Sequence, residues 1–196
     1  MRSRGKGRVV VIAGPTGVGK NSVIKGVIKR CNNCVDLVTA TTRPPRPDEK
    51  NGVDYFFMSE KEFDTNVKVG NIVEVYRHPA GFRNGTYAPF FNEHFDKGET
   101  ILGDITIEGA RFLKDHHGIL GIFIMPPSFK ILESRIRARK ASMPADELER
   151  RLALAKKEIK EDAPWYDYRI VNEEGKLNET VDKVIEILKK ERYIDE

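Results

Sequence analysis

The sequence has very few cysteines. The two that it contains, Cys31 and Cys34, form the run CNNC. A CxxC pair can be a redox couple or half of a zinc site. A zinc site needs two more ligands, and none of the four histidines shows ligand-like spacing to this pair. We therefore expect two reduced thiols at the end of a helix and no metal bound there.

Long apolar runs are also missing. No stretch approaches the roughly 18 residues that a membrane-spanning helix needs. The run VVVIAG near the N-terminus is too short for the apolar part of a secretory signal and leads directly into glycines. We found no internal repeat and no low-complexity tract, and the share of apolar residues, 39%, argues against disorder. These absences favour a soluble, cytoplasmic protein without a membrane partner.

Strong charge of one sign is absent as well. The formal charge is +4, and the first eight residues (MRSRGKGR) supply four of the positive charges. This mild excess fits an anionic substrate. No basic helix interleaved with aromatics is present, so we expect no nucleic-acid partner. The length of 196 residues suits one compact domain with an insertion or two.

Short apolar segments alternate with amphipathic segments along much of the chain. Buried strands are predicted at 8–13, 35–39, 101–105, 121–125 and 168–171. Helical spacing is found at 22–30, 109–116, 128–139 and 177–192. This alternation predicts an α/β fold with a doubly wound parallel sheet.

Two regions break the alternation. Residues 40–98 are rich in Pro, Gly, Asn and aromatics, with β-like pieces at 55–58 and 72–76, and predict an inserted β-containing subdomain. Residues 137–163 predict a second helical region that starts at Ser142-Met143-Pro144. Its inward stripe would consist of Leu148, Leu152, Ala155 and Ile159.

A glycine-rich loop follows the first predicted strand and precedes a helix. It consists of Gly14, Pro15, Thr16, Gly17, Val18, Gly19, Lys20, Asn21 and Ser22. A loop that wraps a phosphate turns its amide N–H groups inward, which glycine allows at low cost, and the helix adds its positive dipole end. Lys20 is placed to bridge the β- and γ-phosphates of ATP. The strict motif has a hydroxyl directly after the lysine; here Asn21 intervenes, so we assign the Mg²⁺ role to Ser22.

A second anion site is predicted in the segment TTRPPRP. Arg43 and Arg46 lie three positions apart in a loop stiffened by prolines. Guanidinium groups held in fixed directions suit forked hydrogen bonds to one phosphate. The hydroxyl of Tyr55, in the run NGVDYFF, can add a third donor. An isolated RxxR is often a solvated basic loop, but its position after a strand in a phosphate-loop protein favours binding.

From about Val9 to the C-terminus the sequence resembles the guanylate kinase family. The matching runs are GPTGVGKNS, TATTRPPR, NGVDYFF, IVEV, FIMPPS and RIVNEE. The resemblance implies a P-loop nucleoside monophosphate kinase that uses ATP and Mg²⁺. Its parts would be a three-layer core with a parallel sheet (8–39, 99–135, 164–196), an NMP-binding insertion (40–98) and a helical lid (136–163).

The resemblance also assigns roles to single residues. It puts Arg43, Arg46 and Tyr55 on the acceptor phosphate, and Thr39, Glu74 and Thr86 at the acceptor base. Three arginines look like those that clamp ATP and the moving phosphoryl group, namely Arg135, Arg139 and Arg151. Asn172 is similar to the residue near the adenine of ATP. Arg137 and Arg150 read as surface charges.

The chain departs from the family pattern at two places. The family has two acidic residues on the strand that here reads ILGDIT; Asp104 stands at the first and would hold Mg²⁺ through water. Thr106 replaces the second, which helps to read the acceptor base, and stays a candidate contact. Asn84 replaces a family tyrosine that binds the acceptor phosphate, with one extra residue nearby. Arg83 and Tyr87 are candidates to compensate for that loss.

Glu74 makes GMP the expected acceptor. Guanine presents two adjacent donors, N1–H and the 2-amino group, to one carboxylate, whereas adenine N1 is an acceptor. Two alternatives stay open. The chain could be a kinase of the same fold for another phosphorylated small molecule, or a non-catalytic guanylate-kinase-like module that binds phosphorylated peptides. Against the second, such modules typically lack an intact phosphate loop. We expect nucleotides as partners and a monomer or homodimer.

Overall fold

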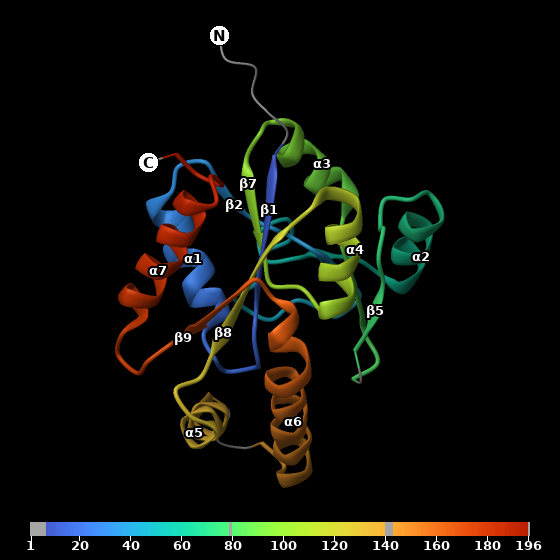
Figure 1. Ribbon diagram of the computed structural model, residues 1–196. Coiled ribbons are helices and arrows are strands. Elements are labelled where there is room, and N and C mark those ends of the chain that lie inside the picture. The colour runs from blue at the N-terminus through green and yellow to red at the C-terminus, as the bar shows by residue number, and fades with distance from the viewer. Residues whose placement is uncertain (1–6, 79, 140–142, 196) are drawn as a thin grey trace. The chain divides into compact units, whose positions relative to one another are not determined.

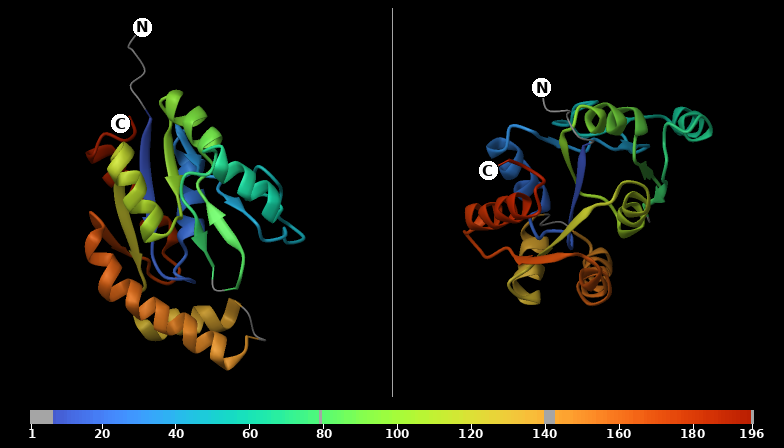
Figure 2. Two further views of the ribbon diagram at one scale, coloured as in Figure 1. Left: turned by 90° about the vertical axis from the view of Figure 1, so that its right-hand side faces the viewer. Right: turned by 45° about the horizontal axis from the view of Figure 1, so that its top comes forward.

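The computed structural model describes residues 7–78, 80–139 and 143–195 (Figures 1 and 2). Within these residues the strands are β1 (Arg8–Ala13), β2 (Cys34–Asp36), β3 (Ala40–Thr41), β4 (Phe56–Phe57), β5 (Tyr76–Arg77), β6 (Arg83–Gly85), β7 (Thr100–Gly103), β8 (Leu120–Met125) and β9 (Tyr168–Val171). The α-helices are α1 (Lys20–Arg30), α2 (Glu60–Lys68), α3 (Ala88–Asp96), α4 (Ile107–His117), α5 (Phe129–Arg139), α6 (Ala145–Lys157) and α7 (Leu177–Lys190).

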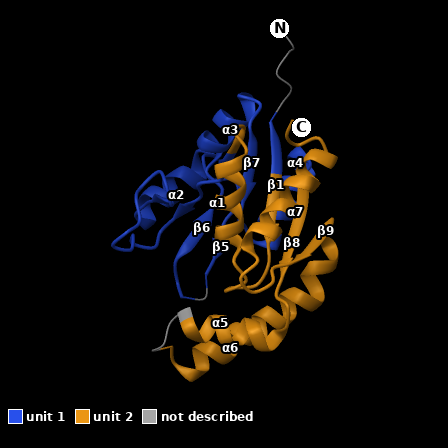
Figure 3. Ribbon diagram, turned by 90° about the vertical axis from the view of Figure 1, so that its left-hand side faces the viewer, with its two compact units in different colours: residues 1–9, 35–119 blue, residues 10–34, 120–196 orange. Residues whose placement is uncertain are grey.

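The strands of the described residues form two sheets. One has the order β2-β7-β1-β8-β9 and the other the order β4-β3-β6-β5. The chain divides into two compact units, residues 1–9 with 35–119 and residues 10–34 with 120–196 (Figure 3). Strand β1 starts in the first unit and continues into the second. The predicted α/β fold with a parallel sheet and a β-containing insertion is confirmed.

In the second unit, β1 and β9 both pair with β8 in parallel. Strand β1 buries five successive residues, as its unbroken apolar sequence predicts for a strand covered on both faces. Helices α5 and α6 lie side by side (Figure 2). Leu148 and Ala155 of the predicted α6 stripe are buried. Ser142, the expected helix start, lies outside the described residues.

Helices α1 and α7 pack directly against each other (Figure 1). Val23, Ile24 and Val27 of α1 are buried, as are Val181, Val184 and Leu188 of α7. Their approach is close because Gly26 carries no side chain: a Cβ there would lie 2.6 Å from Cγ2 of Val181. This contact fixes α7 against the helix that starts in the phosphate loop.

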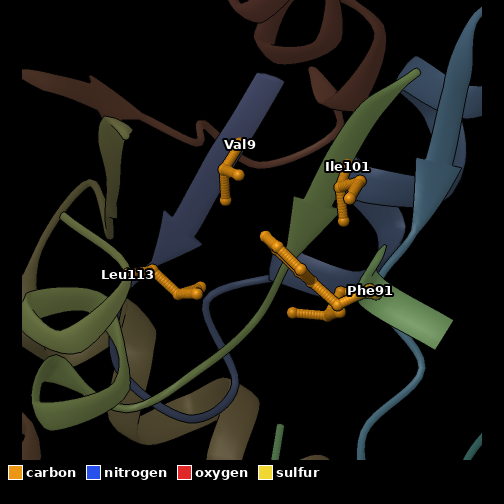
Figure 4. Close-up of a cluster of buried hydrophobic side chains, with 5 residues drawn as sticks. Val9, Phe91, Ile101 and Leu113 are labelled. Atoms are coloured by element: carbon orange, nitrogen blue, oxygen red, sulfur yellow. The ribbon is translucent and has the colours of Figure 1, made fainter. Parts of the chain in front are cut away.

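The first unit has its own apolar core. It is formed by Val9, Leu37, Phe91, Ile101 and Leu113, four of which are labelled in Figure 4. These residues come from four separate elements and the segment after β2, so the core joins distant parts of the sequence. Phe90 and Phe95 of α3 pack against its edge.

The second sheet also lies in the first unit and packs against α2. Helix α2 starts with a capping box, in which Ser59 and Glu62 each accept a backbone N–H of the other. It buries Phe63 against Ala40 and Ile72. Side chains alternate between the faces of a strand, so this packing assigns one face of the sheet to α2 and leaves the opposite face to other functions.

Several local predictions need correction. In its described residues the insertion contains two helices, α2 and α3, that its turn-rich composition did not predict. The predicted strand at 72–76 is mostly irregular: Ile72 makes only an isolated bridge to Tyr87, and the strand lies at Tyr76–Arg77. The strand predicted at 35–39 is shorter, Cys34–Asp36. Sequence periodicity is weak in such short pieces, because hydrogen-bond partners from other segments decide their conformation.

One of the two thiols lies where the sequence predicts, at the end of a helix, whereas the other, Cys34, is the first residue of β2. Cys31 is the C-cap residue of α1, and both cysteines are free. Burial, followed by the neighbouring Cys31, raises the pKa of the Cys34 thiol to about 12. Among the described residues, no helix is long and apolar enough to cross a membrane.

The Gly26 contact gives a first prediction. In an ordinary helix, Gly→Ala stabilises by up to about 1 kcal/mol. Here we expect Gly26→Ala to lower the free energy of unfolding by about 1 kcal/mol, because overpacking costs more than helix propensity gains. Urea denaturation of Gly26→Ala, of Val181→Ala and of the double variant measures the coupling energy between the two positions. If Gly26→Ala is as stable as the parent chain, the helices do not pack as closely as the structure places them.

Candidate functional site

The glycine-rich loop connects β1 to α1. Gly14 has a φ of 141° and Gly19 a φ of 104°, both in the region that favours glycine. A Cβ on Gly14 would lie 2.4 Å from the carbonyl oxygen of Ile124 in β8, and one on Gly19 would lie 2.7 Å from Nδ2 of Asn172. At both positions a side chain would strain the backbone and would clash with a neighbouring atom, so glycine is required.

Helix α1 starts directly from this loop. Gly19 is its N-cap residue and offers no side chain to the first-turn amides, so the helix presents backbone N–H groups and its positive dipole end. Lys20 Nζ donates to the carbonyl oxygen of Gly14 at 2.7 Å, which folds the lysine over the loop. Asn21 and Ser22 are exposed in the first turn. The loop can thus hold an anionic phosphate group.

Asn172 lies beside the loop with its side chain enclosed. It is 7% exposed. Its Nδ2 donates to the carbonyl oxygen of Val18 at 2.8 Å, and its Oδ1 accepts from the hydroxyl of Thr180 at 2.9 Å. The sequence predicted this residue near the adenine of ATP; in the structure its amide is engaged with the phosphate loop and with α7.

The predicted ATP-side arginines come from α5 and α6. Arg135 is half-buried, and its Nη2 donates to the backbone oxygen of Asn172 at 3.2 Å. Arg151 donates from Nε to Glu147 at 2.7 Å. The side chain of Arg139 lies outside the described part of the structure. Arg137 pairs with Glu133 and Arg150 with Glu147, and both are exposed, as the sequence predicts for surface charges.

The predicted phosphate-binding arginines lie in the first unit around one carboxylate. Both terminal nitrogens of Arg43 donate to Glu49, each at 2.9 Å. The backbone N–H of Arg46 also donates to Glu49 at 2.8 Å, and its guanidinium lies 3.6 Å away. Only 16% of the Arg43 side chain and 14% of the Glu49 side chain are exposed. The hydrogen bond from Arg43 lowers the pKa of Glu49, which keeps this carboxylate ionised.

Tyr55 lies within the same cluster. Its ring centroid is 5.3 Å from the guanidinium carbon of Arg43 and 5.7 Å from the ring centroid of Phe57. Burial raises the pKa of the Tyr55 hydroxyl, with the negative charge of Asp104 as the next cause. The phenol therefore stays protonated and can donate a hydrogen bond.

A half-buried carboxylate, Glu74, lies elsewhere in the first unit. Its Oε2 accepts from the backbone N–H and from the hydroxyl of Thr86, both at 3.1 Å. A Cβ on Gly109, in the first turn of α4, would lie 3.1 Å from Oε1, so the other oxygen faces a position without a side chain. Burial raises the pKa of Glu74, against the two Thr86 hydrogen bonds, which lower it. Such a carboxylate can accept from two adjacent donors of a planar ligand.

Strand register collects the predicted acceptor residues on one face of the second sheet. Thr41 pairs with Phe57 and with Asn84, and Asn84 pairs with Tyr76. Paired residues share a face, and residues two apart on a strand share it too. By this alternation Thr39, Tyr55, Glu74 and Thr86 belong to that same face, opposite the one that packs on α2.

The two candidates to compensate for Asn84 do not lie on this face. Arg83 donates to Asp64 of α2 at 2.6 Å, forms an ion pair with Glu60 and lies over the ring of Phe63. Tyr87 packs against Phe56, with ring centroids 4.6 Å apart. The expectation that either one replaces the family tyrosine was therefore wrong, because neighbouring positions on a strand point to opposite faces. Tyr76, directly across from Asn84, is a further phenol on that face besides Tyr55.

Thr106 and Asp104 lie where β7 leads into α4. Thr106 is the N-cap of α4 and accepts from the backbone N–H of Gly109 at 3.2 Å. Threonine thus retains the capping role that a carboxylate could also fill. Asp104 is exposed. The described residues contain no cluster of three His, Cys, Asp or Glu side chains able to hold a metal ion. A hydroxyl such as that of Ser22 is still a hard oxygen donor that suits Mg²⁺ together with phosphates and water.

Sequence reasoning missed three residues of these clusters. Glu49 had a signal, since an acidic residue three positions after Arg46 can pair with it. Tyr76 had none, because the register between β5 and β6 is not visible in the sequence. Thr180 had no signal either, because it lies in α7, far along the sequence from the loop that it supports.

Comparison with known proteins agrees with this geometry. Residues 6–191 match the family described as "Guanylate kinase". A guanylate kinase of Thermotoga maritima is 37% identical over 195 residues, covering 95% of this chain and 88% of that protein. One of Rickettsia prowazekii is 34% identical, covering 98% and 95%. The crystal structure of guanylate kinase from Anaplasma phagocytophilum matches with a TM-score of 0.73 at 31% identity, covering 95% of this chain and 86% of that one. The chain belongs to the guanylate kinase family.

Proposed function

We propose that this enzyme transfers the γ-phosphoryl group of ATP to GMP and releases ADP and GDP. The observation that carries the choice of acceptor is the half-buried carboxylate of Glu74, which Thr86 holds by two hydrogen bonds. Guanine offers it two adjacent donors, whereas adenine would present an acceptor to a partly desolvated charge, which is costly. Family membership supports both the phosphate donor and the acceptor.

On the ATP side, we propose that the loop of residues 14–22 wraps the phosphates with its backbone N–H groups. Lys20 would leave the Gly14 carbonyl and bridge the β- and γ-phosphates. Arg135, Arg139 and Arg151 would neutralise the transferring group. Asn172 would act through the loop and not through the adenine, because its amide is already hydrogen-bonded to Val18.

On the acceptor side, we propose that Arg43, Arg46 and Tyr55 bind the phosphate of GMP. Glu74 and Thr86 would read guanine, with Thr39 and Thr106 beside them. Tyr76 would supply the phenol that the chain lacks at Asn84, since the two are direct cross-strand partners. The division into core, insertion (40–98) and lid (136–163) completes this proposal.

The chemistry needs no general base, because the acceptor phosphate is already an anion. Catalysis would consist of positioning and charge neutralisation. Ser22, through its hydroxyl, and Asp104, through water, would hold Mg²⁺, which would supply further charge neutralisation. The guanidinium groups of Arg43 and Arg46 would orient the acceptor oxygen for in-line attack.

A substrate panel tests the function. ADP release with ATP and Mg²⁺ is measured against GMP, dGMP, AMP, CMP and UMP, with a control that lacks an acceptor. We expect strong turnover with GMP, and we expect Lys20→Ala to reduce it by about a hundredfold or more while the fold is retained. Turnover confined to another nucleotide would contradict the acceptor. ATP binding without turnover on any of them would favour a different phosphorylated acceptor or a binding module.

The half-buried carboxylate of Glu74 predicts a pH dependence. Burial raises the pKa of Glu74, and only the ionised form accepts both guanine donors. We therefore expect the KM for GMP to rise as the pH falls, beginning above the usual range of a glutamate, while the KM for ATP stays constant. In Glu74→Gln this pH dependence should disappear. The stability of Glu74→Gln at neutral pH should be equal to that of the parent chain or higher, because the folded state of the parent disfavours the ionised carboxylate. A Glu74→Gln enzyme with an unchanged KM for GMP would contradict the assignment.

The Glu49 cluster predicts an effect on the acceptor alone. Glu49→Gln removes the charge that holds Arg43 by two hydrogen bonds. A less well fixed guanidinium should raise the KM for GMP by about three- to tenfold, with the KM for ATP within twofold of the parent value. The neighbouring exposed residue provides the control variant Asp48→Asn, which should leave both constants unchanged. A lower KM for GMP in Glu49→Gln would instead mean that Glu49 competes with the acceptor phosphate.

A further inference from the structure

The Val18–Gly19 peptide bond lies at the centre of the phosphate loop. Its carbonyl oxygen accepts a hydrogen bond from Asn172 Nδ2 at 2.8 Å. In a trans peptide the C=O and the following N–H point in opposite directions. The contact with Asn172 therefore directs the N–H of Gly19 away from Asn172. Because Gly19 has a positive φ and no side chain, nothing within the residue itself restrains this peptide.

The orientation of the Asn172 amide depends in turn on Thr180. A carbonyl can only accept, so Nδ2 must face Val18 and Oδ1 must face away from it. Oδ1 accepts from the Thr180 hydroxyl at 2.9 Å. Thr180 is 2% exposed and lies in the first turn of α7. Since α7 packs tightly on α1 at Gly26, the hydroxyl is held in place.

The backbone of Asn172 adds a third connection. Its N–H donates to the carbonyl oxygen of Met125 at the end of β8, at 2.9 Å. Its carbonyl oxygen accepts from Nη2 of Arg135 at 3.2 Å. One buried residue thus contacts the phosphate loop, β8, α7 and an arginine assigned to the transferring phosphoryl group.

We propose that Thr180 is a positioning residue for ATP, acting through Asn172 to fix the Val18–Gly19 peptide with its N–H toward the bound phosphates. The proposal rests on the ATP-binding role of the loop and goes beyond it, because the Thr180 hydroxyl bonds to Asn172 and acts on the loop through that side chain. The hydroxyl holds the amide in the one orientation that can donate to Val18.

The test is Thr180→Val, which keeps the shape of the side chain and removes the hydroxyl. It leaves Oδ1 of Asn172 buried without its donor, so the amide loses its fixed orientation. We expect the Kd for ATP·Mg²⁺, measured by calorimetry without acceptor, to rise by about three- to tenfold. The KM for GMP should stay within twofold of the parent value. Thr180→Ser, which restores the hydroxyl, should bind ATP like the parent chain.

Thr65→Val is the matched control. Thr65 of α2 donates to the carbonyl four residues earlier at 2.9 Å. The corresponding carbonyl, that of Lys176, lies 3.4 Å from the Thr180 hydroxyl, whose single hydrogen goes to the nearer Asn172 oxygen. The control therefore makes the same change of side chain in a helix without touching Asn172, and we expect unchanged ATP binding. Asn172→Asp is the second variant: it keeps an acceptor for Thr180 but turns an oxygen toward the Val18 carbonyl. Its Kd for ATP should rise at least as much as that of Thr180→Val.

Two results would overturn the proposal. One is a Kd for ATP in Thr180→Val equal to that of the parent chain. The other is an increase that Thr180→Ser shows equally, which would trace the effect to packing and not to the hydroxyl. Because ATP binding is measured without acceptor, this outcome is independent of the substrate panel. Failure of GMP phosphorylation in the parent chain would leave the comparison of ATP affinities valid.

Discussion

A loop that turns its amide N–H groups toward an anion leaves the carbonyl groups of the same peptides pointing the other way, and buried carbonyls need donors. In the second unit, side chains from several elements donate to these carbonyl groups. Lys20 donates to the Gly14 carbonyl, and Asn172 donates to the Val18 carbonyl. Asn172 is in turn fixed by Thr180 and by the end of β8. The packing of α7 on α1 is thereby connected to the shape of the phosphate loop.

In the first unit, the main constraint is to hold charged side chains close together before a ligand binds. Two arginines close together repel each other, and Glu49 offsets this by accepting from both. The carboxylate of Glu74 is partly buried at a cost, which its raised pKa reflects, and Thr86 offsets part of that cost. The sheet of β4, β3, β6 and β5 brings these groups to one face because side chains alternate along each strand. That same alternation directs Arg83 toward the acidic residues of α2.

The loop, the arginine segment and the long amphipathic elements could be predicted from sequence, since each depends on residues that are close together in the chain. Strand β1, helix α1 and helix α7 were found within a few residues of their bounds because their apolar periodicity is strong. The insertion was not predicted in detail. Its strands have two or three residues, and its helices α2 and α3 interrupt a turn-rich segment. In such pieces tertiary partners outweigh local propensity.

The sequence by itself determined the family, the α/β class and the phosphate loop. The family and the loop follow from contiguous motifs, in which glycines, a lysine and arginines at this spacing are typical of phosphate binding. The α/β class follows from the alternation of short apolar and amphipathic segments. Only the tertiary structure decided that Asn172 supports the loop and that Glu49 holds both arginines. It also decided that Tyr76, and neither Arg83 nor Tyr87, shares the face with Glu74. These roles depend on which strands pair, in which register, and on hydrogen bonds between residues such as Asn172 and Val18, which are 154 positions apart. A one-residue change of register would reverse every face assignment, and no local pattern in strands this short specifies the register.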